Sequence, residues 1–141
     1  MKKTLLALST ISALTSASEV YFIEPADGDK FTGDVKVVFG LSDFGVAPAG
    51  IKLPNTGHHH LLINAELPAD MSLPIRADFN HRHFGLGQTE TVLSLEPGTY
   101  KLQLLMGNYL HIPHDDPIFS EVITITAVSY THLTLPTTPY V

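Results

Sequence analysis

Residues 89–106 read TETVLSLEPGTYKLQLLM, and this stretch carries the clearest indication of the fold. Two runs in which apolar and polar residues alternate, 89–95 and 99–106, flank a Pro-Gly pair. An alternation with a period of two residues is typical of a half-buried β-strand. In the second run it places these side chains on one face: Tyr100, Leu102, Leu104 and Met106. We therefore predict two strands, each with one face in a hydrophobic core.

The connection between these two strands has its own signature. Pro97 presets the backbone dihedral φ, and Gly98 accepts a positive φ, which suits a type II turn. The position of Tyr100 just after the turn resembles the tyrosine corner of immunoglobulin-like domains. The alternative is an ordinary inward-facing tyrosine after a hairpin. The opposite face of the strand, with Lys101 and Gln103, is expected to be exposed to solvent.

Outward from this stretch, the chain continues as short runs separated by Pro, Gly, Asn and Asp. Such runs lie at 20–23, 35–41, 58–64 and 119–127. No run shows a sustained helical period, and we find no internal repeat and no second domain. About seven short strands in one hundred or so residues are typical of a two-sheet sandwich. The predicted fold class is therefore all-β, an immunoglobulin-like two-sheet sandwich that occupies residues 19–127.

Residues 1–18 have the features of a secretory signal peptide. The start is basic, an apolar run covers 5–14, and small residues occupy 15–18. The apolar run is too short for a transmembrane helix, which needs about 20 apolar residues. The alternative is a buried N-terminal helix. With a signal peptide, the mature protein is expected to be periplasmic or extracellular, with no membrane span.

The C-terminal segment 128–141 reads VSYTHLTLPTTPYV and follows the last alternating run. Residues 128–137 resemble the translation of one reading frame of a transposase sequencing adapter. We interpret the segment as an assembly artefact in place of the native end, and the alternative is a genuine Thr/Pro-rich tail. His132 is therefore left out of the candidate site.

Composition narrows the classes of function. The chain has 8 Lys and Arg against 14 Asp and Glu, and loss of Lys2 and Lys3 with a signal peptide would give a net charge of −8. An acidic protein repels phosphate backbones, which argues against nucleic-acid binding. The chain has no cysteine, so thiolate zinc sites, iron–sulfur clusters and blue-copper sites are excluded.

Seven histidines of the expected domain fall into three clusters. These are His58, His59 and His60, then His81 and His83, then His111 and His114. Histidines two positions apart on a strand share a face, so His58 and His60 are expected to converge. His81 and His83 share a face as well if residues 80–84 are extended. Neutral imidazole is the commonest protein ligand of metals.

The predicted sandwich brings these clusters together, since the connections that carry them share one end of an immunoglobulin-like fold. The candidate metal ligands are His58, His60, His81, His83, His111 and His114. His59 is expected to be partly in the core. Nearby carboxylates could complete the coordination sphere or orient the imidazoles: Asp78, Glu90, Asp115 and Asp116.

Other interpretations of the histidines stay open at this point. They could hydrogen-bond to backbone carbonyls and order the loops, or they could form a pH-responsive surface. An iron enzyme with two histidines and one carboxylate also fits the residue types. No nucleophile motif supports Ser/His/Asp catalysis, so we favour a binding module over an enzyme.

The segments that carry the histidines resemble a known family. They are 44–50 (FGVAPAG), 54–63 (PNTGHHHLLI), 80–90 (NHRHFGLGQTE) and 111–117 (HIPHDDP). Together they are similar to an uncharacterised family of secreted bacterial proteins, domain of unknown function 4399, over about 20–127. The resemblance implies a secreted single-domain β protein whose His motifs belong together. It implies no activity and names no metal.

The sequence thus predicts a secreted or periplasmic module that binds a divalent transition metal, with copper, zinc and nickel as candidates. Cu(II) should bind most tightly to an all-nitrogen site. The alternative is a structural or protein-interaction domain whose histidines only order the loops. A protein partner is not identified by the sequence.

Overall fold

The computed structural model describes residues 16–129 of the chain. All regular elements in this range are strands, with no helix among them: β1 (Glu19–Glu24), β2 (Lys30–Thr32), β3 (Val35–Ser42), β4 (Gly45–Val46), β5 (Thr56–Ile63), β6 (His81–His83), β7 (Glu90–Leu93), β8 (Gly98–Gly107) and β9 (Ile123–Val128). Accordingly, no helix long and apolar enough to cross a membrane occurs in this part of the chain. Residues 1–15 of the expected signal peptide and 130–141 of the tail lie outside the described residues.

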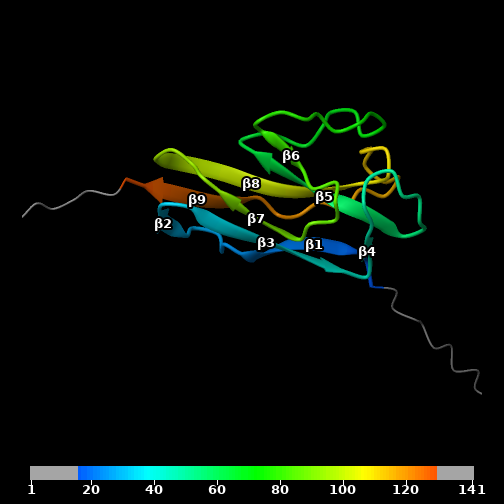
Figure 1. Ribbon diagram of the computed structural model, residues 1–141, viewed down its shortest axis with the longest axis horizontal. Helices are drawn as coiled ribbons and strands as arrows, with labels where there is room; N and C mark the ends of the chain where they lie inside the picture. Colours follow the sequence, from blue (N-terminus) through cyan, green and yellow to red (C-terminus); the bar gives the residue numbers. More distant parts are fainter. Residues whose placement is uncertain (1–15, 130–141) are drawn as a thin grey trace, which may run out of the picture.

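The strands form two sheets, which lie one above the other in Figure 1. The smaller sheet has three strands in the order β1-β3-β7. The larger has six, in the order β2-β9-β8-β5-β4, with β6 paired to β5. Most neighbours are antiparallel, and the exceptions are the parallel pairs β2–β9 and β4–β5. The prediction of an all-β protein with two sheets is confirmed.

Three strands were not expected from the sequence, and each is short. β2, β4 and β6 have three, two and three residues, which is too short to show an alternation. The last strand also differs, because it begins at Ile123 rather than at 119. It continues to Val128, which pairs with Thr32.

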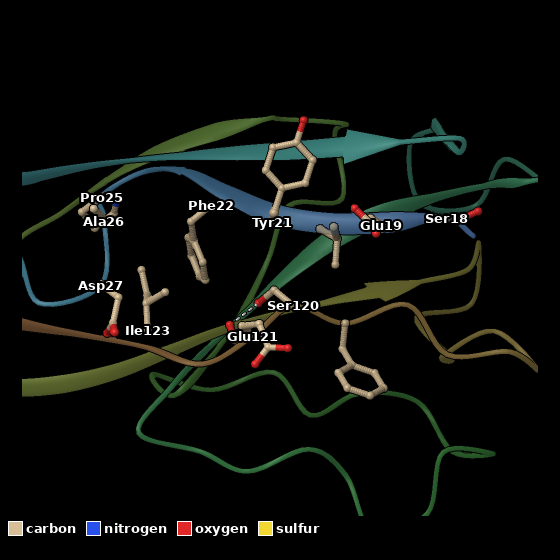
Figure 2. Close-up of a pocket in the computed structure, with 12 residues that line it drawn as sticks. Ser18, Glu19, Tyr21, Phe22, Pro25, Ala26, Asp27, Ser120, Glu121 and Ile123 are labelled. Atoms are coloured by element: carbon tan, nitrogen blue, oxygen red, sulfur yellow. Dashed lines mark hydrogen bonds between the residues drawn. The ribbon is translucent and has the colours of Figure 1, made fainter. Parts of the chain in front are cut away.

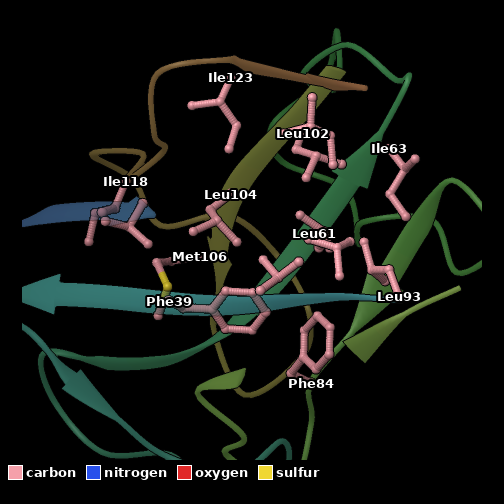
Figure 3. Close-up of a cluster of buried hydrophobic side chains, with 14 residues drawn as sticks. Phe39, Leu61, Ile63, Phe84, Leu93, Leu102, Leu104, Met106, Ile118 and Ile123 are labelled. Carbon is pink, nitrogen blue, oxygen red and sulfur yellow. The ribbon is translucent and has the colours of Figure 1, made fainter. Parts of the chain in front are cut away.

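The hydrophobic core lies between the two sheets (Figure 3). The smaller sheet contributes Val37, Phe39 and Leu93, and the larger sheet contributes Leu61, Ile63, Leu102, Leu104, Met106 and Ile125. These residues alternate along their strands, as a sheet with one face in a core requires. The predicted inward positions of β8 are therefore confirmed, with Leu102, Leu104 and Met106 in the core and Tyr100 packed against it.

The connection between β7 and β8 agrees with the sequence analysis in one respect and differs in another. The Tyr100 hydroxyl donates a hydrogen bond to the Glu96 carbonyl oxygen at 2.6 Å, as a tyrosine corner requires. The predicted type II turn is wrong, because Gly98 has a φ of 155° instead of about 80°. Tyr100 is thus hydrogen-bonded to this connection as expected, although the connection is not a type II turn.

The expectation of an exposed Gln103 is also wrong. Its side chain is buried, and its amide nitrogen donates to the Ser120 carbonyl oxygen at 2.9 Å. The Ser120 hydroxyl in turn accepts a bond from the Leu104 backbone amide. The segment that leads into β9 runs along the edge of β8, where Leu105 and Phe119 form an antiparallel bridge, and it supplies the partner of Gln103 that the alternation of residues alone could not reveal. Lys101 is exposed, as expected.

This difference gives a stability prediction. We expect Gln103→Ala to cost about 1–3 kcal/mol, because it leaves a buried carbonyl oxygen without its partner. Lys101→Ala, two residues earlier on the same face, should change the free energy of unfolding by less than about 0.5 kcal/mol. Urea unfolding of both variants measures the two costs. Equal costs would show that the hydrogen bond from Gln103 to Ser120 adds no stability in solution.

Candidate metal centre

Strand β5 presents its three consecutive histidines to opposite faces of the larger sheet. His59 points into the core, where its ring lies 5.0 Å from the ring of Phe39. His58 and His60 point to the outer face, and all three side chains are fully buried. The expectation that His58 and His60 share a face, with His59 towards the core, is confirmed.

Strand β6 adds a third imidazole, that of His83, on the outer face. β6 and the loop before it lie on the side of the larger sheet away from β1 and β3 (Figure 1). His83 pairs directly with His60, and the centroids of their rings are 4.1 Å apart. His81 pairs with Leu62, one pleat further along the strand. The register of β6 on β5 thus places His83 beside the cluster and His81 away from it, a difference that the sequence alone does not indicate.

His111, from the third histidine cluster of the sequence, lies in a tight turn that follows β8. Asn108 organises this turn, since its side-chain oxygen accepts hydrogen bonds from the backbone amides of Leu110 and Ile112. His111 lies in the left-handed region with a φ of 62°, and its backbone bonds to Asn108 and Ile75 fix it there. A positive φ is uncommon for residues other than glycine. The hydrogen bonds of the turn therefore hold the backbone of His111 in a conformation that it would seldom adopt by itself.

Three ring nitrogens converge at this place. His58 Nε2 lies 2.9 Å from His60 Nε2 and 2.9 Å from His111 Nδ1. All three atoms are within 4.8 Å of one another. Nitrogens that bind one tetrahedral ion at about 2.0–2.1 Å are roughly 3.3 Å apart. Small side-chain movements would therefore bring the three histidines to ligand geometry.

Hydrogen bonds alone cannot satisfy this arrangement. Each imidazole nitrogen carries either one hydrogen or one lone pair in the ring plane. His58 Nε2 has two neighbouring nitrogens but a single hydrogen or lone pair to offer them. A cation at the point of convergence would interact with all three lone pairs at once. The far ring nitrogens of His58 and His60 have no hydrogen-bond partner among the described residues.

Burial keeps these imidazoles neutral. It lowers the pKa of His58 to about 4, with help from His111, His83 and His114, and lowers the pKa of His60 to about 2, with help chiefly from His83. Burial and then His83 also lower the pKa of His111. The ligand form of histidine is the neutral one. Near pH 7 each of the three rings is therefore neutral and keeps one nitrogen lone pair that a metal can bind.

Two glycines make room for the cluster, and the sequence analysis did not single them out. A Cβ on Gly107 would lie 2.5 Å from His60 Nε2, and a Cβ on Gly57 would lie 2.8 Å from His114 Cε1. Gly107 is opposite His58 in the register of β5 and β8. A feature of the sequence that could have pointed to Gly107 is its place at the end of a predicted strand, directly before Asn108.

The other candidate ligands have different partners. His81 Nδ1 lies 2.7 Å from an Asp78 carboxylate oxygen, and His114 Nε2 donates to the Thr56 carbonyl oxygen at 3.0 Å. His83 touches the cluster through its ring, but its Nε2 donates to the Arg76 carbonyl oxygen at 2.7 Å. Among the described residues, the group of converging ligand atoms contains only His58, His60 and His111.

The carboxylates expected near the site do not join this group in the described part of the chain. Asp78 is paired with His81, and Glu90 lies 3.3 Å from the Lys36 ammonium. Asp115 and Asp116 are exposed. The converging donors are therefore all imidazole nitrogens.

A separate groove of about 440 Å³ lies between β1 and the segment 119–123 (Figure 2). Its lining includes Glu19, Asp27 and Glu121, and the described residues that line it include no histidine. The groove is not part of the candidate metal centre.

A family model described as a domain of unknown function (DUF4399) matches residues 37–128, which is more than half of the chain. The chain belongs to the DUF4399 family. The matched region of this DUF4399 member contains the whole histidine cluster, from β5 through β6 to the turn after β8. No curated protein and no solved structure matches the chain. The arrangement of the histidines is therefore what bears on the function of this protein.

Proposed function

We propose that this DUF4399 protein is a secreted or periplasmic module that binds one divalent transition metal through His58, His60 and His111. One observation carries the proposal, namely that the ring nitrogens of these residues lie within 4.8 Å of one another at a buried place. Two of the ligands come from one strand and the third from a turn that is fixed by its own hydrogen bonds. Such a site is largely formed before the metal arrives.

The proposal includes an immunoglobulin-like arrangement of the two sheets, which the order of the strands supports. The smaller sheet, β1-β3-β7, corresponds to strands A, B and E, and β9-β8-β5 corresponds to strands G, F and C. The hydrogen bond from Tyr100 to Glu96 fits the tyrosine corner of these domains. In this arrangement the histidines gather where β8 ends and its turn begins. Export rests on the basic and apolar character of residues 1–18.

The donor set narrows the choice of metal. Imidazole nitrogen suits Cu(II), Zn(II) and Ni(II), and Cu(II) binds most tightly among these ions at a given site. Oxygen-preferring ions such as Mg²⁺ and Ca²⁺ are not favoured, because the converging group contains no carboxylate among the described residues. We expect the order of affinity to be Cu(II) first, followed by Zn(II) and Ni(II).

Metal titration of protein purified without a His tag tests the proposal. One ion should bind per chain and should raise the free energy of unfolding by about 2.7 kcal/mol when free metal is a hundredfold above Kd. His58→Ala, His60→Ala and His111→Ala should each remove most of this gain. His81→Ala is the matched control and should retain it, since His81 faces Asp78. Equal gains in all four variants would contradict the proposed ligands.

A second candidate function has specific observations in its favour. His83 and His114 donate to backbone carbonyl oxygens, and His81 pairs with Asp78, so these three order the loops around the cluster. A structural or protein-interaction domain would use all its histidines in this way. In that case none of the three metals would stabilise the protein, and the titration separates the two functions.

A further inference from the structure

Three features of the histidine cluster bear on what else a bound ion would hold. The first is the number of ligands. The described residues offer three converging nitrogens, whereas a tetrahedral ion has four positions. Closed structural zinc sites use four protein ligands, and sites that react or exchange ligands use three and leave one position for a small molecule.

The second feature is charge. Imidazole ligands are neutral, and the group contains no carboxylate among the described residues, so a divalent ion would keep its full double charge. His58 and His60 are fully buried, and an uncompensated charge in such a place is costly. An anion bound directly to the metal would lower this cost.

The third feature is an open side with a hydrogen-bond acceptor. His111 and His83 are partly exposed, unlike His58 and His60. A carbonyl oxygen can only accept a hydrogen bond, so His83 Nε2, which contacts the Arg76 carbonyl oxygen, carries the hydrogen. In the neutral ring with its hydrogen on Nε2, Nδ1 carries the lone pair. The ring stacks on His111 with 4.7 Å between centroids, beside the cluster.

From these features we infer that the metal centre binds a small exogenous anion or water in its fourth position, on the side of His111 and His83, with His83 as a hydrogen-bond acceptor rather than a ligand. This inference rests on the proposed metal-binding function. Hydroxide and other small anions that coordinate metals are the class of ligand that the position would take. A bound water would donate a hydrogen bond to His83, and an anion without hydrogen would not.

Cobalt(II) with sodium azide as the probe tests the inference on the full chain, because the visible absorption of Co(II) reports its coordination. Bound cobalt is first counted by metal analysis. Azide should then change the Co(II) spectrum in a saturable way that fits one site. Failure to bind cobalt at all would overturn the proposed function. Bound cobalt with a spectrum that azide leaves unchanged would overturn this inference alone.

His83→Phe tests the role of His83, and His81→Phe is the matched control two residues away on the same strand. His83→Phe should leave the affinity for Co(II) within about threefold. It should strengthen azide binding about two- to tenfold, because the competing water loses one hydrogen bond. His81→Phe should change neither value. A loss of Co(II) affinity of about a hundredfold in His83→Phe, with none in His81→Phe, would show that His83 is itself a ligand and would overturn the inference.

Discussion

The metal-free protein is expected to lose about 6 kcal/mol of unfolding free energy between pH 7.5 and pH 5. The cause is the burial of three consecutive histidines, which lowers the pKa of His58 and His59 to about 4 and that of His60 to about 2. In the unfolded chain each would titrate near 6.5. Between pH 6.5 and 4 the unfolded chain therefore binds more protons than the folded one. Acid consequently favours unfolding, and each histidine contributes about 2 kcal/mol by pH 5.

Urea unfolding at a series of pH values measures this loss. Small domains have total stabilities of about 5–15 kcal/mol, so a loss of about 6 kcal/mol is large enough to measure and is a substantial share of the total. The ordinary pKa values of carboxylates are near 4, so histidines dominate between pH 7 and 5. A flat stability over this interval would show that the β5 histidines are not buried in solution.

His59→Leu tests how much His59 alone contributes to the loss of unfolding free energy at low pH. Both ring nitrogens of His59 lack a hydrogen-bond partner among the described residues, and its ring lies against Phe39. Leucine keeps an apolar contact and removes the titrating group. The variant should be at least as stable as the parent at pH 7.5 and about 2 kcal/mol less sensitive to a change from pH 7.5 to pH 5. An unchanged sensitivity would contradict this assignment.

Gly107→Ala should lower metal affinity about a hundredfold or more, although position 107 supplies no ligand. The added Cβ would lie 2.5 Å from His60 Nε2, a proposed ligand atom, and 3.4 Å from the backbone carbon of His111. The His60 ring must move, and the packed surroundings leave it little room. Loss of one nitrogen from a three-nitrogen site removes a large share of its affinity.

Titration with Zn(II) compares this variant with a matched control. Gly85→Ala lies at the same end of the protein, where an added Cβ would be 3.3 Å from Ala49 Cβ and 3.9 Å from His111 Cε1. It should retain metal affinity within a few-fold. If Gly107→Ala binds Zn(II) as tightly as the parent, His60 is not a ligand. Circular dichroism at pH 7.5 confirms that both variants are folded.

The sequence predicted the long strands because each carries its own alternation. Val35, Val37 and Phe39 alternate in β3, and Leu102 and Leu104 alternate in β8. The short strands depend on partners far away in the chain, so no local pattern reveals them. Gln103 shows the same limit, because the partner of its buried amide, Ser120, lies seventeen residues later. Local periodicity describes one strand, whereas coverage of its second face is a tertiary property.

The candidate site was predictable as a set of residues but not as a geometry. The clusters were evident from histidine spacing, and β5 placed His58 and His60 on one face as expected. His81 and His83 also share a face, so spacing treats them alike. Only the pairing of β6 with β5 sets His83 opposite His60 and His81 opposite Leu62. Likewise, His111 meets His58 across 53 positions of sequence through a turn that Asn108 organises.

The alternation of His58, His59 and His60 along β5 has a consequence for how this strand can change during evolution. Inserting or deleting one residue in β5 would exchange its two faces, sending the paired imidazoles into the core and the core side chains outward. The same eight residues of β5 thus supply side chains to the core from one face and to the histidine cluster from the other. Point substitutions can alter one without the other, but a change of length cannot. We therefore expect relatives of this protein to vary in length in the loops that flank β5 and not within the strand.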